Sequence, residues 1–69
     1  MERKPVKSSN IASVGHDPET RKMHVEFQGG SVYEYDGVTA DDHKSFVHAS
    51  SIGGHFAQHI KNKFPAIKL

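Results

Sequence analysis

The fold is decided by the stretch Met23-His24-Val25-Glu26-Phe27-Gln28-Gly29-Gly30-Ser31-Val32-Tyr33-Glu34-Tyr35. Residues 23–28 alternate apolar and polar side chains, which predicts a strand with one buried face. The two glycines tolerate a positive φ and predict a hairpin turn into a second strand. That second strand carries Tyr33 and Tyr35, the only tyrosines of the chain. Their side chains point to the same face, and the strand register decides whether they form a ligand platform or part of the core.

Two hairpin registers are compatible with the glycine pair. A two-residue loop would place Glu34 opposite Val25 on the apolar face. A three-residue loop, Gln28–Gly30, would instead place Glu34 opposite His24 on the wet face and turn both tyrosines toward the core. Burying an unpaired carboxylate costs several times more than the roughly 0.2–1 kcal/mol of a favourable cross-strand pair. We therefore predict the three-residue loop, with Gly30 in the left-handed position of a G1 bulge and the tyrosines primarily in the core.

The remaining elements follow from turn and cap signals. Residues 10–16 predict a short strand, and Asp17-Pro18-Glu19-Thr20 predicts the turn into the next one. Thr39 has the position of a helix N-cap, with Asp42 able to complete a capping box, in a helix that reaches about residue 49. A second helix is expected from residue 54 or 55 to the Phe64-Pro65 pair, because the residue before a proline disfavours helical backbone.

These elements predict an α+β fold, a three-stranded antiparallel meander with two short C-terminal helices on one face. Residues 1–9 are expected to form a flexible basic arm, residues 10–65 the single domain, and residues 66–69 a C-terminal tail. A chain of 69 residues forms one domain with a small core. Two adjoining glycines, Gly53-Gly54, lie ahead of the second predicted helix, where a flexible connector is expected more than a phosphate-binding turn.

The composition excludes several classes of site. The chain has no cysteine, which excludes disulfides, thiolate zinc sites and cysteine nucleophiles. No apolar run approaches the roughly 20 residues of a membrane helix, and the first residues do not resemble a signal peptide. We expect a cytoplasmic protein that does not associate with membranes.

The net charge of +1 hides an uneven distribution. Residues 1–10 carry three bases against one acid, residues 11–49 carry three bases against seven acids, and residues 50–69 carry three bases and no acid. The two basic ends would form one basic patch if the fold brought them together, and otherwise they are solvated tails.

No catalytic or cofactor site is predicted. His55 and His59 are four residues apart on a predicted helix and could bind zinc together, but no third ligand has a suitable spacing. Asp41 and Asp42 are explained by the helix start rather than by acid–base chemistry. His48 has serines nearby, yet no nucleophile elbow or oxyanion site accompanies it. We therefore predict a protein that is not an enzyme, with no bound metal, no cofactor and no small-molecule substrate.

The order and spacing of several segments resemble the KTSC domain, a short module found at the C-terminus of some lysyl-tRNA synthetases and as a stand-alone bacterial or phage protein. The resemblance covers roughly residues 6–65, and the Tyr-x-Tyr motif, here Tyr33 and Tyr35, is its hallmark. His16 and His55 stand where an aromatic or other residue is commoner in the family. The segments that carry the resemblance are Ser8-Ser9-Asn10-Ile11-Ala12-Ser13-Val14-Gly15, Asp17-Pro18-Glu19-Thr20, Val25-Glu26-Phe27, Ser31-Val32-Tyr33-Glu34-Tyr35, Gly37-Val38, Ala49-Ser50-Ser51-Ile52-Gly53, His55-Phe56 and Ile60-Lys61-Asn62-Lys63-Phe64-Pro65.

The resemblance implies a non-catalytic binding module, for which RNA is the usual suggestion, by analogy with the synthetase attachment. Basic side chains would contact phosphates, and an aromatic ring or a histidine would stack on a base. The alternative is a protein-interaction module that docks a partner on the open sheet face or along an edge, where residues 10–16 offer small side chains. The candidate nucleic-acid-binding residues are Arg3, Lys4, Lys7, Tyr33, His55, Lys61, Lys63 and Lys68.

Overall fold

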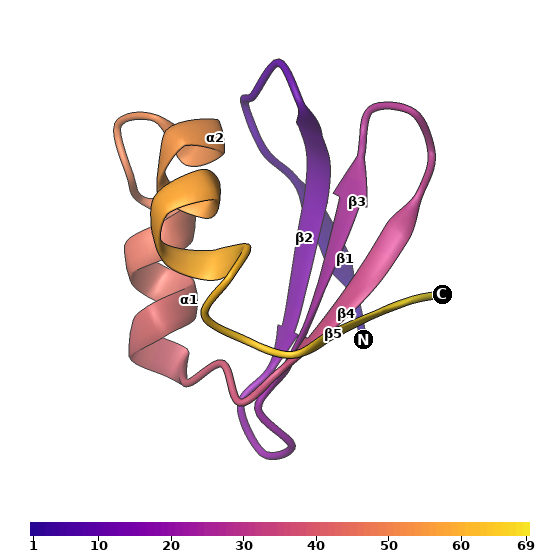
Figure 1. The fold of residues 1–69 in the computed structure, drawn as a ribbon, viewed down its shortest axis with the longest axis vertical. Coiled ribbons are helices and arrows are strands. Elements are labelled where there is room, and N and C mark those ends of the chain that lie inside the picture. The colour runs from indigo at the N-terminus through magenta and orange to yellow at the C-terminus, as the bar shows by residue number, and fades with distance from the viewer.

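Five antiparallel strands form one sheet in the computed structural model, which describes residues 1–69. Their order in the sheet is their order in the sequence, β1 to β5, and the helices pack on one face (Figure 1). None of the helices is long and apolar enough to cross a membrane. The elements are β1 (Arg3–Pro5), β2 (Ile11–Asp17), β3 (Lys22–Phe27), β4 (Val32–Asp36), α1 (Ala40–Val47), α2 (Ile52–His55), the π-helix η1 (Phe56–Ile60) and β5 (Ala66–Lys68).

The β3–β4 hairpin has the predicted three-residue loop. Val25 lies opposite Tyr33 and His24 lies opposite Glu34. Gly30 has φ of +98° and donates its N–H to the carbonyl of Phe27 over 2.8 Å, which closes the turn. The register that keeps Glu34 out of the apolar face is therefore confirmed.

The prediction of three strands was wrong, because the sheet has five. β1 lies in the segment predicted as a flexible arm and pairs with β2, and β5 lies within the predicted tail and pairs with β4. The helices consequently precede the last strand and are not C-terminal. Both added strands are three residues long and sit at sheet edges, where a segment needs a backbone partner but no alternating pattern.

Gly15 explains why β1 can lie against β2. A Cβ atom at Gly15 would come within 2.8 Å of the backbone oxygen of Glu2, closer than real Cβ contacts. The missing side chain therefore lets the N-terminal segment lie close alongside β2. This pairing also corrects the expectation that residues 10–16 form a free edge, because β1 already occupies that side of β2.

The first helix begins as predicted. The Thr39 hydroxyl accepts a hydrogen bond from the Asp42 N–H, and the Asp42 carboxylate accepts one from the Thr39 N–H, which completes a capping box. The second helix starts earlier than predicted, because Ser51 is its N-cap and Gly53-Gly54 lie inside α2. The glycine pair is therefore not a connector, and the Gly54 N–H already donates to the Ser51 hydroxyl over 3.1 Å.

The core lies between the sheet and the helices. Phe46 of α1 and Ile60 of η1 are buried against side chains from β2, β3 and β4. Burial of such side chains stabilises the fold by about 1.5–3 kcal/mol each. The eight buried hydrophobic residues are Ile11, Val14, Met23, Val25, Tyr35, Val38, Phe46 and Ile60.

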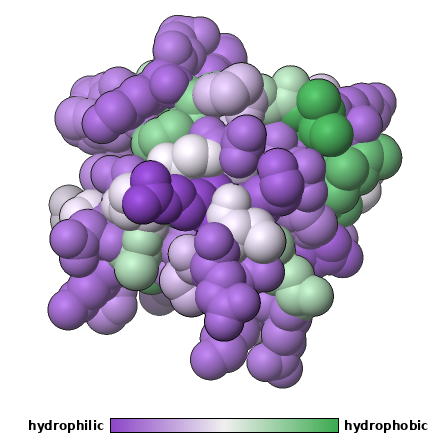
Figure 2. Space-filling view, turned by 90° about the horizontal axis from the view of Figure 1, so that it is seen from below, coloured by the Kyte–Doolittle hydropathy of each residue, from purple (hydrophilic) through white to green (hydrophobic).

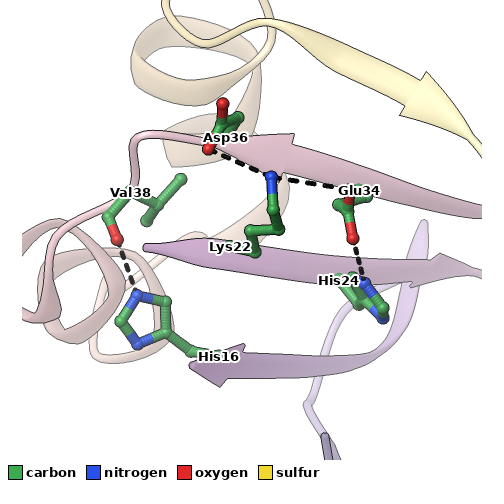
Figure 3. A network of polar contacts seen from close by, with 6 residues as sticks. All are labelled: His16, Lys22, His24, Glu34, Asp36 and Val38. Atoms are coloured by element: carbon green, nitrogen blue, oxygen red, sulfur yellow. Dashed lines mark hydrogen bonds and ion pairs between the residues drawn. The ribbon is translucent and has the colours of Figure 1, made fainter. Parts of the chain in front are cut away.

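The opposite face of the sheet carries a polar network (Figure 3). His24 Nε2 lies 2.9 Å from Glu34 Oε1, and Lys22 Nζ lies between Glu34 and Asp36, at 3.9 and 3.4 Å. Ser13 donates its hydroxyl hydrogen to Glu26 Oε1 over 2.7 Å. Figure 2 shows the molecule from below the view of Figure 1. This side is mainly hydrophilic, with hydrophobic side chains gathered toward the right of the picture.

Candidate nucleic-acid interface

A cleft of about 810 Å³ opens between the sheet and the second helix. Its lining includes residues of the β1–β2 connection, the β3–β4 hairpin and α2, and Figure 1 shows this connection and this hairpin at the same end of the sheet. We call it the aromatic cleft. It is lined by Ser9, Asn10, Ile11, Phe27, Gln28, Gly29, Ser31, Tyr33, Tyr35, Gly53, Phe56, Ala57, Lys61 and Ala66.

Four aromatic rings meet in edge-to-face contacts along this cleft. The Phe27 ring lies 5.7 Å from Tyr33 and 5.4 Å from Phe56, and Tyr35 lies 5.7 Å from Phe56, all measured between centroids. Interplanar angles of 76–86° give each pair the preferred T-shaped geometry. Such packing fixes the rings in place, so the apolar wall exists before any ligand arrives.

The two tyrosines of the hallmark motif have different environments. Tyr35 is 4% exposed, as predicted for a core aromatic, whereas Tyr33 is half-buried and packs against the edge of the core. Burial, with a smaller contribution from Tyr33, raises the pKa of Tyr35 above its ordinary value. The core assignment is thus confirmed for Tyr35, while Tyr33 keeps part of its surface in the cleft.

Polar groups at the mouth of the cleft are held by local hydrogen bonds. The Ser8 hydroxyl accepts hydrogen bonds from the N–H groups of Asn10 and Ile11, at 3.3 and 3.2 Å. Gln28 donates its side-chain amide to the carbonyls of Ser8 and Ile11, at 3.3 and 3.4 Å. The β1–β2 connection and the hairpin are thereby joined, which sets Ser9 and Asn10 along the rim.

The π-helix brings a lysine to the same cleft. In η1 the Lys61 N–H donates to the Phe56 carbonyl over 2.9 Å, an i→i+5 bond. In an α-helix residues five apart lie about 140° apart around the axis, whereas the wider π-turn brings them nearer to one side. Phe56 and Lys61 accordingly both line the cleft.

The predicted basic residues do not form one patch. β1, with Arg3 and Lys4, and β5, with Lys68, are opposite edges of the sheet with three strands between them. Lys68 lies opposite Tyr33 in the β4–β5 pair, so these two side chains share a face. Lys63 lies apart from the cleft lining, with its amino group 5.6 Å from the centroid of the Phe64 ring.

Lys7 is connected to the cleft through a smaller depression. That depression shares Ser9, Asn10 and Gly53 with the aromatic cleft and has Lys7 among its lining residues. Of the candidate residues, Tyr33 and Lys61 therefore line the cleft itself, and Lys7 and Lys68 lie on its approaches. No local signal in the sequence indicated that Phe27 and Phe56 would line this cleft.

His55 lies outside the cleft. Its ring is 5.9 Å from Phe46 and 4.7 Å from His59, measured between centroids. Burial and the neighbouring His59 both lower the pKa of His55. No group of three or more histidine and acidic side chains is arranged to hold a metal ion.

Comparison with known proteins identifies the relatives of the chain. The family model of the KTSC domain matches residues 7–64. The crystal structure of a KTSC domain protein from Yersinia pestis superposes with a TM-score of 0.92 at 40% identity, covering 99% of this chain and 96% of that one. An uncharacterised protein of Stutzerimonas stutzeri is 38% identical over 61 residues, which span 88% of this chain and 86% of the relative.

One relative is much longer. A lysine–tRNA ligase of Nostoc punctiforme is 38% identical over 56 residues, or 81% of this chain. The matched segment spans only 10% of the ligase.

Proposed function

The chain belongs to the KTSC domain family, and from that premise we propose that it is a non-catalytic module that binds single-stranded RNA in the aromatic cleft. The observation that carries the proposal is the placement of Tyr33, Phe56 and Lys61 around one preformed opening. Aromatic rings for bases and a cation for the backbone are the two components that single-strand binding sites combine. Tyr33 is the stacking residue, because it retains exposed surface in the cleft.

Lysines would follow the RNA backbone away from the cleft. Lys61 lies on the helix side of the cleft, and Lys68 of β5 lies beside Tyr33 of β4. Lys7 lines the smaller depression that shares Ser9, Asn10 and Gly53 with the cleft. All three side chains belong to exposed residues and none forms an ion pair within the protein. Asn10 at the rim offers its amide group and Gln28 its amide oxygen, and such groups hydrogen-bond the edges of unpaired bases.

A relative supports RNA as the ligand. The match to a lysine–tRNA ligase links the same domain to a protein whose substrate is an RNA. Single-stranded loops and ends are favoured over duplexes, because a base has to leave its stack to enter an aromatic pocket.

Fluorescence anisotropy with a single-stranded RNA oligomer, at low and moderate salt, tests the proposal. Stacking on an aromatic side chain contributes about 1–3 kcal/mol per base, so Tyr33→Leu should weaken binding by about fivefold to more than a hundredfold. Lys61→Gln should reduce the slope of log affinity against log salt by about 0.7. Absence of salt-dependent binding at tens of micromolar protein would refute RNA binding.

Lys44→Gln provides the matched control. Lys44 is an exposed lysine of α1 that does not line the cleft, so its loss changes the net charge as Lys61→Gln does. Equal weakening by the two substitutions would show non-specific attraction and exclude the cleft as the binding site. The oligomer binding of Tyr33→Leu is interpreted together with its thermal unfolding, which separates lost stacking from lost packing.

A second candidate function is protein docking along β5. This edge strand has an unpaired side, and Ile67 within it and Leu69 directly after it are each 58% exposed. A partner strand could extend the sheet there through main-chain hydrogen bonds. Co-purification of a defined protein that is lost with Ile67→Lys and retained with Lys61→Gln would favour docking over RNA binding.

A further inference from the structure

A second depression, of about 750 Å³, lies between the N-terminal strands and α1. We call it the lysine–histidine depression, after Lys4, Lys7, His16, His43 and His48 in its lining. We propose that it binds a tetrahedral dianion, the phosphate group of a small ligand, through its lysines and its stacked histidine pair. The proposal concerns a different cavity from the aromatic cleft and does not depend on RNA binding.

The charge around this depression is strongly biased. Its cationic and titratable groups come from three parts of the chain, namely β1 with the residue pair that follows it, β2, and α1 with its C-cap residue His48. Glu2 is the single carboxylate in the lining. The three ion pairs of the protein all lie on the open sheet face, so neither Lys4 nor Lys7 has a carboxylate partner. The site therefore has unneutralised cations facing a concave surface.

Other charged groups near α1 do not compensate for this bias. Asp42 precedes His43, but its carboxylate is engaged by the Thr39 N–H in the capping box. Lys44 follows His43 and adds a further positive charge. Asp17 follows His16 along β2, so its side chain points to the opposite face of the sheet, where Lys22 is its cross-strand neighbour. An anion entering the depression would meet only one carboxylate, that of Glu2.

The histidine pair can respond to an anion. The rings of His16 and His43 are stacked with centroids 4.6 Å apart and an interplanar angle of 9°. His16 Nε2 lies 2.7 Å from the Val38 carbonyl oxygen, as Figure 3 shows, so this nitrogen must carry its hydrogen and donate it. Its Nδ1 is then the nitrogen that gains a proton when the ring becomes charged.

Protonation of His43 is opposed by its surroundings. Burial, His16 and then His48 lower the pKa of His43, in that order of importance. A bound dianion would offset the repulsion from these two histidines and favour the charged form of His43. Anion binding and proton uptake should therefore be coupled, and affinity should rise as the pH falls through the range in which the histidines titrate.

Sulfate is the appropriate probe, because it has the shape and charge of a phosphate dianion but does not titrate between pH 5 and 8. We expect titration with sulfate, at constant ionic strength in chloride, to shift the imidazole NMR signals of His16 and His43. Affinity should increase by up to about tenfold per pH unit for each proton taken up. Equal affinity at pH 5.5 and 7.5, or signals of His43 that respond no more than those of His59, would overturn the proposal.

Two substitutions separate binding from folding. His43→Gln should remove most of the pH dependence, whereas His59→Gln, at an exposed position on η1 outside the depression, should leave it unchanged. Lys7→Gln alters an exposed side chain and should weaken sulfate binding by about two- to fivefold, as expected for a solvent-exposed ion pair. Sulfate affinity that is unaffected by Lys7→Gln and by Lys4→Gln would also overturn the proposal.

Inorganic phosphate, adenosine monophosphate and adenosine distinguish the possible sources of the phosphate group. Similar affinities for phosphate and the nucleotide would assign a free anion, and tighter binding of the nucleotide would assign a phosphorylated metabolite. Adenosine that binds as tightly as its monophosphate would overturn the proposal. A failure of the RNA oligomer to bind would leave all of these results unaffected, so the two proposals fail separately.

Discussion

Substitution of Gly15 by alanine should detach β1 from the sheet and leave the rest of the domain folded. The new Cβ would lie 2.8 Å from the Glu2 backbone oxygen and 3.0 Å from Arg3 Cγ. A flexible side chain could move away, but the backbone oxygen can move only if β1 moves with it. The strand is held by three residue pairs with β2, one of which is Pro5, and Pro5 has no N–H to donate.

The cost of this detachment is small because few hydrogen bonds are lost. At a net contribution of about 0.5–1.5 kcal/mol per hydrogen bond, loss of the β1 pairing should destabilise the protein by roughly 1–3 kcal/mol. In a domain of this size each kcal/mol lowers Tm by about 4–8 °C. The core between the sheet and the helices contains no residue of β1, so cooperative unfolding should persist.

Hydrogen exchange of the Val6 amide provides the direct assay. This N–H donates to the Ala12 carbonyl over 3.1 Å and reports on the attachment of the N-terminal segment. Gly29→Ala is the matched control, because a Cβ atom at Gly29 would have no atom within 4 Å. Retention of Val6 protection in Gly15→Ala at the level seen in Gly29→Ala would refute the explanation of why β1 pairs with β2.

Three further predictions concern stability. Burial lowers the pKa values of His43 and His55, so as the pH falls below about 6.5 the unfolded chain takes up protons that the folded protein does not. Urea unfolding should therefore show a free energy of unfolding that falls toward pH 5, and it should fall less in His43→Gln. Thr39→Ala removes the cap hydroxyl that Asp42 N–H uses, and chemical denaturation should show a loss of about 0.5–2 kcal/mol. Phe46→Ala creates a cavity at a fully buried position and should cost about 3–5 kcal/mol, so that circular dichroism at 37 °C detects a substantial unfolded fraction.

The central hairpin could be predicted from the sequence because one large energetic difference decided it. Either loop length satisfies the glycine pair, but only one keeps Glu34 off the apolar face, and the structure has that register. The start of α1 was predictable for a similar reason, since the side chains of Thr39 and Asp42 each accept a hydrogen bond from the backbone N–H of the other at a fixed spacing.

The outer strands could not be predicted in the same way. Arg3-Lys4-Pro5 is entirely exposed, and so is Ala66-Ile67-Lys68, so neither segment needs a pattern with one apolar face. Their place in the sheet depends on the availability of a neighbouring backbone and, for β1, on the missing side chain of Gly15. Both are tertiary properties that a local sequence pattern does not contain.

The candidate site was predictable only in part. Tyr33 and Lys61 were selected for their chemistry, whereas Phe27 and Phe56 are apolar residues whose spacing indicates burial and not a place in the cleft. The aromatic cleft arises because the helices leave one end of that face uncovered. The stacking of His16 on His43 joins residues far apart in the sequence, and no spacing rule could have found it.

The π-turn of η1 makes the cleft tolerant of a change in chain length. Its five residues occupy a turn that a regular α-helix would close one residue sooner, and the wider turn keeps Phe56 and Lys61 on one side of the helix despite their five-residue spacing. Deletion of a single exposed residue such as Gln58 should convert the π-turn into an α-helical turn, in which the ring and the lysine, then four residues apart, stay on the same side. A one-residue change in the length of this helix could thus leave the lysine in the lining of the cleft, which gives this small domain a way to vary the exposed side of the helix without changing the cleft or the core.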